Sequence, residues 1–133
     1  MYLFDASALV NLVKKGRVKP LARGATIELA LYESLNAVWK EYRLLGRIDE
    51  ETALRFVDVI SSVFSVIEML SVKSLERGIF ELAARDGLTV YDASYLYAAM
   101  KNGYTLVTDD RELRSRASRY VETASSNEIA DRY

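Results

Sequence analysis

Short apolar runs alternate along the chain with longer stretches in which apolar residues recur at helical spacing. The runs are rich in β-branched and aromatic residues and predict strands at residues 2–4, 24–27, 64–67, 105–108 and 120–123, with a short strand or turn at 88–90. The amphipathic stretches predict helices from residue 6 to Gly16, at 29–45, from Asp49 through residue 60, and at 72–86, 91–101 and 111–117.

Strands that alternate with helices require crossover connections, and these connections place the helices on both faces of a sheet. The pattern therefore predicts an α/β fold, a three-layer α/β/α sandwich with a mostly parallel central sheet. A chain of 133 residues with no internal repeat or linker is expected to form one domain, 1–133. No window reaches the ~20 apolar residues that span a bilayer, and the N-terminus is unlike a signal peptide, so we expect a cytoplasmic protein without membrane contact.

Acidic side chains follow two of the predicted strands. Asp5 comes directly after the strand at 2–4, and Asp109 and Asp110 follow the strand at 105–108. Asp92 lies at the opening of the helix at 91–101, where the helix dipole favours a carboxylate. Because sites in parallel sheets form beyond the carboxyl ends of the strands, these acids belong on one edge of the sheet. Each of them has a simpler explanation as a helix cap or a turn residue.

Glu33 is a further candidate on the helix at 29–45. It forms a polar stripe with Asn36 and Lys40 beside the apolar face of that helix. A solvated helix face explains the stripe equally well, so Glu33 gains interest only if it borders the aspartates.

The absence of Cys and His excludes thiolate nucleophiles, catalytic triads that use His, and ordinary zinc sites. Carboxylates that gather in one place repel one another, and a bound Mg²⁺ or Mn²⁺ relieves that repulsion. Such an ion can acidify a bound water and stabilise charge on a phosphoryl group. Metal-dependent hydrolysis of a phosphodiester is therefore the leading hypothesis.

Two basic runs lie close to the acidic positions, although the net charge of the chain is only −1. Solvated surface is one interpretation of these runs, and contact with a nucleic-acid backbone is the other. The first run comprises Lys14, Lys15, Arg17 and Lys19, and the second comprises Arg111, Arg114, Arg116 and Arg119. Within them, the candidates for RNA contact are Lys14, Lys15, Arg111 and Arg114.

The sequence resembles a PIN domain and, within that superfamily, the VapC toxins of prokaryotic toxin–antitoxin pairs. The resemblance covers essentially the whole chain and is carried, in order, by YLFDASALV, YESLNAVWK, TVYDASYLYAA and TLVTDDREL. It implies a catalytic quartet of Asp5, Glu33, Asp92 and Asp110, with Asp5, Asp92 and Asp110 as metal ligands. Asp110 is preferred to Asp109 because the family pattern is Thr-x-Asp. Ser7, Thr108 and Asp109 would position water or substrate.

The same resemblance implies a Mg²⁺- or Mn²⁺-dependent endoribonuclease that acts on RNA, forms a homodimer and is inhibited by a small VapB-type antitoxin. Other functions stay open: a housekeeping PIN-domain nuclease that processes RNA, a PIN fold that only binds, a receiver-like phospho-acceptor domain and a carboxylate-pair glycosidase. The receiver hypothesis would require an isolated aspartate at the end of a middle strand, whereas the strand at 105–108 ends in two adjacent aspartates.

Aromatic residues lie close to the acidic motifs. Tyr91, Tyr95 and Tyr97 could stack on bases, but packing in a core or a dimer interface is the more common role of such residues. Trp39 is expected to be buried between helix and sheet.

Overall fold

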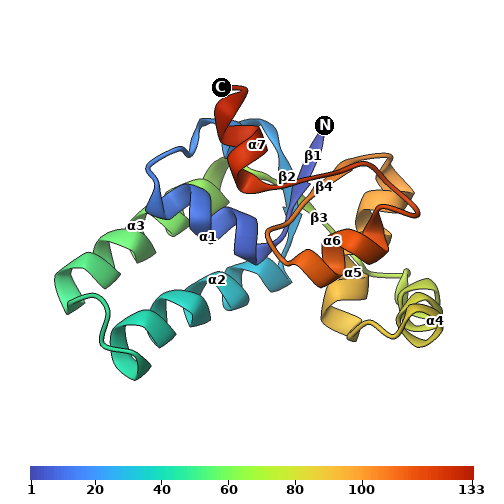
Figure 1. Ribbon diagram of the computed structural model, residues 1–133, viewed down its shortest axis with the longest axis horizontal. Coiled ribbons are helices and arrows are strands. Elements are labelled where there is room, and N and C mark those ends of the chain that lie inside the picture. Colours follow the sequence, from blue (N-terminus) through green and yellow to red (C-terminus); the bar gives the residue numbers. More distant parts are fainter.

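A computed structural model describes residues 1–133 and contains one five-stranded sheet in which every pairing is parallel (Figure 1). The strands lie in the order β3-β2-β1-β4-β5, so β1 occupies the centre. The predicted α/β class with a largely parallel sheet is confirmed. The strands span Tyr2–Phe4 (β1), Ala25–Ile27 (β2), Glu68–Leu70 (β3), Thr105–Val107 (β4) and Thr123–Ala124 (β5).

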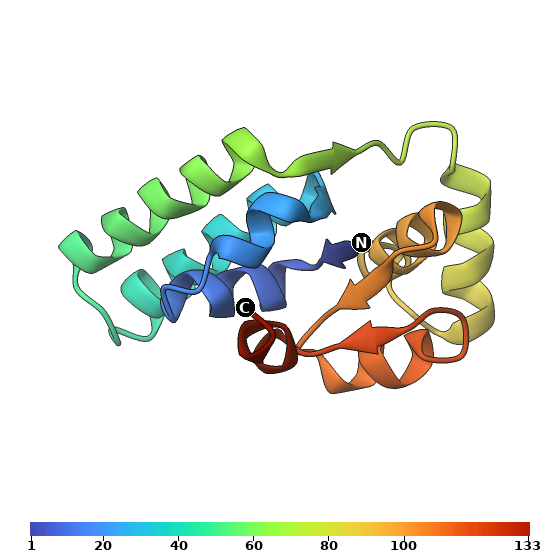
Figure 2. The same ribbon diagram turned by 90° about the horizontal axis from the view of Figure 1, so that it is seen from above.

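Helices cover both faces of the sheet, as the two views show (Figures 1 and 2). One face packs against α1, α3, α7 and most of α2, and the other packs against α4, α5, α6 and the first turn of α2. The α-helices span Ala6–Lys14 (α1), Leu29–Trp39 (α2), Glu50–Val66 (α3), Glu76–Asp86 (α4), Val90–Asn102 (α5), Arg111–Ala117 (α6) and Ser126–Asp131 (α7). A 3₁₀-helix (η1, Lys19–Arg23) precedes β2, and a π-helical turn (η2, Lys40–Leu44) extends α2.

The two helical layers are possible because neighbouring residues of the central strands point to opposite faces. In β1, Leu3 belongs to the apolar cluster under α4, α5 and α6, whereas Phe4 belongs to the cluster under α1, α3 and α7. Leu106 and Val107 divide in the same way in β4. All four side chains are fully buried, so the central strands are apolar on both faces.

Short polar side chains fix where most helices begin. The side chains of Asp5, Asp49, Thr89, Asp110 and Ser125 each accept a backbone N–H in the first turn of α1, α3, α5, α6 and α7, respectively. Two candidate site acids, Asp5 and Asp110, are therefore helix caps as well.

The strand predicted at residues 64–67 is wrong. These residues form the last turns of α3 and the bend that follows it, and the strand lies at Glu68–Leu70. Ala53, Ile60 and Val63 are buried along one side of α3, so helical packing outweighs the β-branched composition of its end. Residues 88–90 form no strand, because Thr89 caps α5 there.

Three further expectations need correction. The last strand lies at Thr123–Ala124 rather than at 120–123, and the sequence analysis missed α7 altogether. Trp39 is half exposed at the end of α2 instead of buried, because it lies beyond the edge of the sheet near the π-helical turn.

None of the helices is long and apolar enough to cross a membrane.

A close backbone approach in front of β2 leads to the first prediction. A Cβ atom added at Gly24 would lie 2.3 Å from Cε2 of Phe4, whose ring is fully buried. We expect Gly24→Ala to lower the free energy of unfolding by about 1–3 kcal/mol, the usual cost of overpacking. Urea unfolding measures the change.

The contact with Phe4 is tested by a second substitution. Phe4→Leu in the Gly24→Ala background should restore part of the lost stability, and Ala22→Ser, on the exposed side of η1, should have little effect. Equal unfolding midpoints for Gly24→Ala and the unmodified chain would contradict the close approach.

Candidate functional site

The register of β1 and β4 brings two distant turns together. Phe4 is aligned with Val107, so the next residues, Asp5 and Thr108, emerge side by side at the carboxyl edge of the sheet. The N–H of Asp5 donates to the carbonyl oxygen of Val107 at 3.0 Å. The edge predicted from the sequence is therefore formed by adjacent strands.

The carboxylate of Asp5 is almost fully buried and accepts three hydrogen bonds. Its Oδ1 accepts from the Ser7 hydroxyl at 2.7 Å and from the Ala8 N–H at 2.9 Å, and its Oδ2 accepts from the Thr108 hydroxyl at 2.5 Å. Burial raises the pKa of Asp5 to about 6, although these three hydrogen bonds lower it; the nearby charge of Asp109 adds to the rise. A cation at this edge would favour the charged form.

The hydroxyls of Ser7 and Thr108 also hold the turn after β4. The Asp109 N–H donates to Ser7 Oγ at 3.0 Å, and the Asp110 N–H donates to Thr108 Oγ1 at 3.1 Å. Each hydroxyl thus donates to Asp5 and accepts from a backbone N–H. The two turns form one hydrogen-bonded unit around the buried carboxylate.

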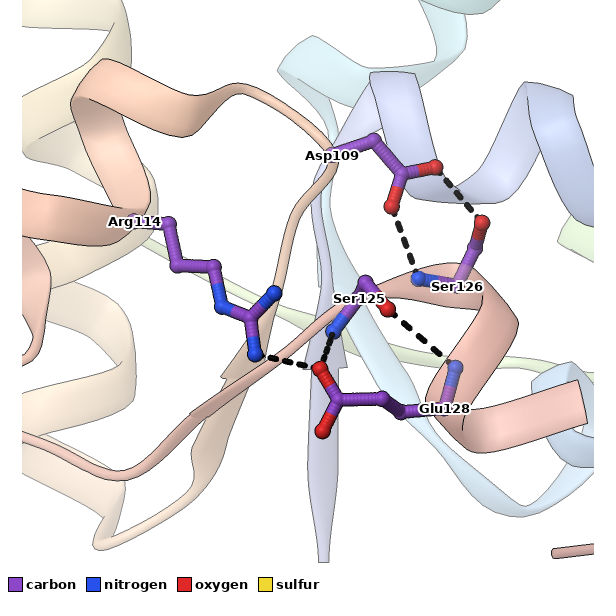
Figure 3. A network of polar contacts seen from close by, with 5 residues as sticks. All are labelled: Asp109, Arg114, Ser125, Ser126 and Glu128. Carbon is purple, nitrogen blue, oxygen red and sulfur yellow. Dashed lines mark hydrogen bonds and ion pairs between the residues drawn. The ribbon is translucent and has the colours of Figure 1, made fainter. Parts of the chain in front are cut away.

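Asp109 and Asp110 have different surroundings despite being adjacent. Asp109 Oδ1 accepts from the Ser126 N–H at 2.7 Å, and its Oδ2 accepts from the Ser126 hydroxyl at 2.6 Å (Figure 3). The same Oδ2 also accepts from the Asn11 amide at 2.6 Å. Asp110 is exposed, and only its Oδ1 is engaged, by the Leu113 N–H at 3.0 Å. Asp109 therefore joins three elements together, whereas Asp110 keeps one oxygen free.

Asn11 and Ser126 are site-supporting residues that the sequence analysis missed. Ser126 opens α7, whose start is fixed by a capping box between Ser125 and Glu128, and Glu128 also pairs with Arg114 (Figure 3). The Ser-x-x-Glu spacing at 125–128 was a readable signal for this helix. Ser7 and Asn11 lie four residues apart and are the only polar residues of α1 before Lys14 at its end, which was the signal for Asn11.

Glu33 faces the same region from α2. Its Oε1 accepts from the hydroxyl of Tyr95 at 2.7 Å, and Tyr95 is fully buried in the core beneath α5. Burial, then the hydrogen bond to Glu33, raises the pKa of Tyr95, so this phenol stays protonated as a donor. Tyr95 is thus packed and hydrogen-bonded rather than free to stack on a base, while Tyr91 is exposed.

Asp92 is half-buried in the first turn of α5, and its carboxylate accepts no hydrogen bond from the chain. Burial raises its pKa, and the charges of Asp110, Glu33 and Glu112 raise it further. The charges of Asp110 and Glu33 therefore reach Asp92, whereas Asp5 is not among the charges that act on it. In their present conformations, no three acidic side chains lie close enough together to hold a metal ion.

Three of the four basic candidates already have partners within the chain. Lys14 pairs with Glu41, Lys15 donates to Asn127, and Arg114 pairs with Glu128. Only the side chain of Arg111, exposed at the start of α6, has no such contact. The structure therefore does not single out the predicted set as an RNA-binding surface.

Comparison with known proteins gives a consistent family relationship. The PIN domain model matches residues 2–118. Exonuclease VapC9 of Pyrobaculum aerophilum is 40% identical over 123 residues, which cover 91% of this chain and 89% of that protein. Ribonuclease VapC3 of the same organism is 35% identical over 120 residues, which cover 84% of this chain and 91% of that protein.

Solved structures agree with this relationship. The crystal structure of PAE2754 from Pyrobaculum aerophilum superposes with a TM-score of 0.80 and 37% identity, and the match covers 98% of this chain and 94% of that one. The structure of DNA-bound VapBC from Salmonella typhimurium gives a TM-score of 0.64 at 19% identity, and the match covers 94% of this chain and 97% of that one. At this identity it supports the fold alone. With the family model matched over nearly its whole length and VapC proteins among its relatives, this chain belongs to the PIN domain family.

Proposed function

We propose that this protein is a Mg²⁺- or Mn²⁺-dependent endoribonuclease that hydrolyses RNA through Asp5, Glu33, Asp92 and Asp110, and that it is the toxin of a VapBC pair. The observation that carries the proposal is that Asp5 is hydrogen-bonded, through Thr108, to the turn that carries Asp110, and that the charges of Asp110 and Glu33 in turn act on Asp92. Two of these acids, Asp5 and Asp92, have raised pKa values, which is typical of residues with a chemical role.

The donor set fits a hard divalent cation. Mg²⁺ keeps several waters and is commonly held by only one or two carboxylates, so a cluster of three converging acids is not required. The carboxylate of Asp92 and one oxygen of Asp110 have no donor within the chain, and Asp5 Oδ2 has a single donor. We assign Asp5, Asp92 and Asp110 as the ligands. The bound ion would supply an acidified water and stabilise charge on the phosphoryl group.

The remaining polar side chains position the metal ligands and the turn after β4, or accept a proton from the attacking water. Ser7 and Thr108 commit their hydroxyl protons to Asp5 and keep its carboxylate in one orientation. Glu33 is fixed through one oxygen by Tyr95, which leaves Oε2 able to accept a proton from the attacking water. Asp109 positions the turn after β4 rather than contacting the substrate, because its oxygens already accept three hydrogen bonds.

The relatives support a nuclease and leave two choices to experiment. One is named an exonuclease and the other a ribonuclease, and both are VapC proteins. Because both relatives carry the VapC name, we propose a VapB-type antitoxin partner rather than a housekeeping role in RNA processing. A homodimer is part of the proposal, and exposed apolar side chains on α4 and α5, such as Phe80 and Tyr91, are consistent with it.

The nuclease proposal is tested with linear and circular RNA. The protein should cleave both with Mn²⁺ or Mg²⁺ and stop when the ion is chelated. Asp92→Asn should lower the cleavage rate by about a hundredfold or more, equivalent to about 3 kcal/mol of lost transition-state stabilisation. Asp58→Asn, an exposed acid on α3, serves as the matched control. Cleavage of linear RNA alone would mean an exonuclease, and full activity of Asp92→Asn would remove that residue from the site.

The different roles of the adjacent aspartates are separated by two variants. Asp110→Ser keeps an oxygen that can cap α6 and removes the carboxylate, so we expect near-normal stability with loss of cleavage. Asn11→Ala removes one donor to Asp109 and should lower the free energy of unfolding by about 1.5 kcal/mol or more. The metal affinity of Asn11→Ala, measured by calorimetry, should stay within a few-fold of that of the unmodified chain. The reverse pattern would make Asp109 the ligand.

The buried charge of Asp5 predicts that the free energy of unfolding of the metal-free protein depends on pH. The folded pKa of about 6 exceeds the ordinary value of 3.8, so the folded state binds the proton more tightly. The stability due to this protonation is fully present below pH 3.8 and is lost as the pH rises through about 6. Under chelation, Asp5→Asn should therefore gain stability relative to the unmodified chain as the pH rises from about 4 to 7, by up to about 3 kcal/mol.

That advantage of Asp5→Asn should shrink toward about pH 4, where both side chains are neutral in the folded protein. Adding Mn²⁺ should raise the melting temperature of the unmodified chain but not that of Asp5→Asn. A stability difference that does not change with pH would contradict the assigned burial cost.

A further inference from the structure

A polar cavity of about 520 Å³ lies between the C-terminal end of α4 and the helix α6. No apolar residue lines it. Three arginines against two carboxylates give its lining a formal charge of +1. The lining consists of Arg85, Asp86, Glu112, Ser115, Arg116 and Arg119, and we call it the arginine pocket.

Arg116 is held in place on one wall of the arginine pocket. Its guanidinium donates to the carbonyl oxygen of Asp86 and, through Nη2, to Glu112 Oε1 at 3.1 Å. Gly87 makes this approach possible, because its φ is +67° and a Cβ atom there would lie 3.0 Å from Arg116 Nη1. A guanidinium fixed in this way loses little further entropy when it binds an anion.

The other two arginines carry charge that the chain does not fully neutralise. The guanidinium of Arg85 lies over the ring of Tyr120, 5.6 Å from its centroid, and its Nε is 3.7 Å from Asp86. The carboxylate of Asp86 is mostly covered and accepts the Tyr120 hydroxyl at 2.7 Å. Arg119 is exposed and its side chain has no partner. Two cationic groups therefore remain available to a ligand.

The arginine pocket adjoins the carboxylate edge. Glu112 lines the pocket and is also one of the charges that act on Asp92. Asp110 caps α6, and Arg116 follows six residues later. At a rise of about 1.5 Å per residue, this places the two roughly 9 Å apart along the helix axis. One short helix thus carries an acidic end at the site and a basic end at the pocket.

We propose that the arginine pocket binds a backbone phosphate of the RNA strand, one or two nucleotides away from the phosphate at the carboxylate edge. This inference rests on the proposed ribonuclease function. Acids at the site repel an anionic strand, so substrate binding needs cationic contacts close by, and arginine forks match phosphate geometry. The wholly polar lining favours RNA over an acidic peptide, since protein partners usually bury apolar anchors.

The test measures RNA binding with cleavage switched off by Asp92→Asn. In that background, Arg85→Ala/Arg119→Ala should weaken binding of a single-stranded RNA of about ten nucleotides. The slope of log affinity against log salt should fall by about 0.7 for each phosphate that the variant no longer neutralises. Arg43→Ala/Arg55→Ala removes the same charge from the distant η2 and α3 and should leave the slope unchanged. The side chain of Arg119 has no partner within the chain, so Arg119→Ala should not disturb the fold. A loss of RNA affinity in this single variant therefore cannot be due to misfolding.

Catalysis gives a second readout. In the cleavage-competent chain, the Arg85→Ala/Arg119→Ala variant should raise KM for the longer RNA several-fold with kcat little changed, and a dinucleotide too short to reach the pocket should be unaffected. Unchanged affinity and salt slope would overturn the inference even if RNA is cleaved, and this includes the case in which the pocket serves an acidic protein. Arginine-dependent RNA binding without any cleavage would instead refute the ribonuclease and leave the pocket standing.

Discussion

The burial of one carboxylate, Asp5, organises the edge of this sheet. An almost fully buried charge is unfavourable unless donors or a cation surround it, and here Ser7, Ala8 and Thr108 supply three donors. Two of these donors also hold backbone N–H groups of the turn after β4. Contacts that fix both turns therefore offset part of the cost of burying this charge. The pKa of Asp5 is still raised, which shows that part of the cost remains, and a bound cation would offset it.

A second layer of contacts extends from this unit to the C-terminal helix. Asp109 connects α1, through Asn11, with the first residue of α7, Ser126. At the far end of α7, Arg17 donates to the carbonyl oxygens of Ala130 and Tyr133, so the helix is held at both ends. A six-residue helix has little stability of its own. Its first residue, Ser126, supplies two of the three hydrogen bonds that Asp109 accepts, whereas no residue of α7 is hydrogen-bonded to Asp110.

Charge is separated over a short distance on the α6 side of the molecule. Asp110 lies at the acidic edge, Arg116 and Arg119 line the arginine pocket, and Glu112, which pairs with Arg116, lies between them. The local field on this side of the molecule therefore differs from the average set by the net charge of −1. Two of the predicted RNA-contact residues, Lys14 and Arg114, are instead used in ion pairs.

The sequence by itself determined the alternation of strands and helices, the bounds of the helix at 111–117, and the placement of Asp5, Asp109 and Asp110 after strands, because periodicity and strand ends are local properties. It could not decide between the end of α3 and a strand at 64–67, since β-branched residues fit both and only packing on the sheet selects the helix. It placed Trp39 inside, although the end of α2 extends beyond the sheet. The division of labour between Asp109 and Asp110 and the arginine pocket also depend on residues far apart in the chain. The register of β1 with β4 and the docking of α7 bring the partners of Asp109 together, and the packing of α6 against the end of α4 forms the pocket.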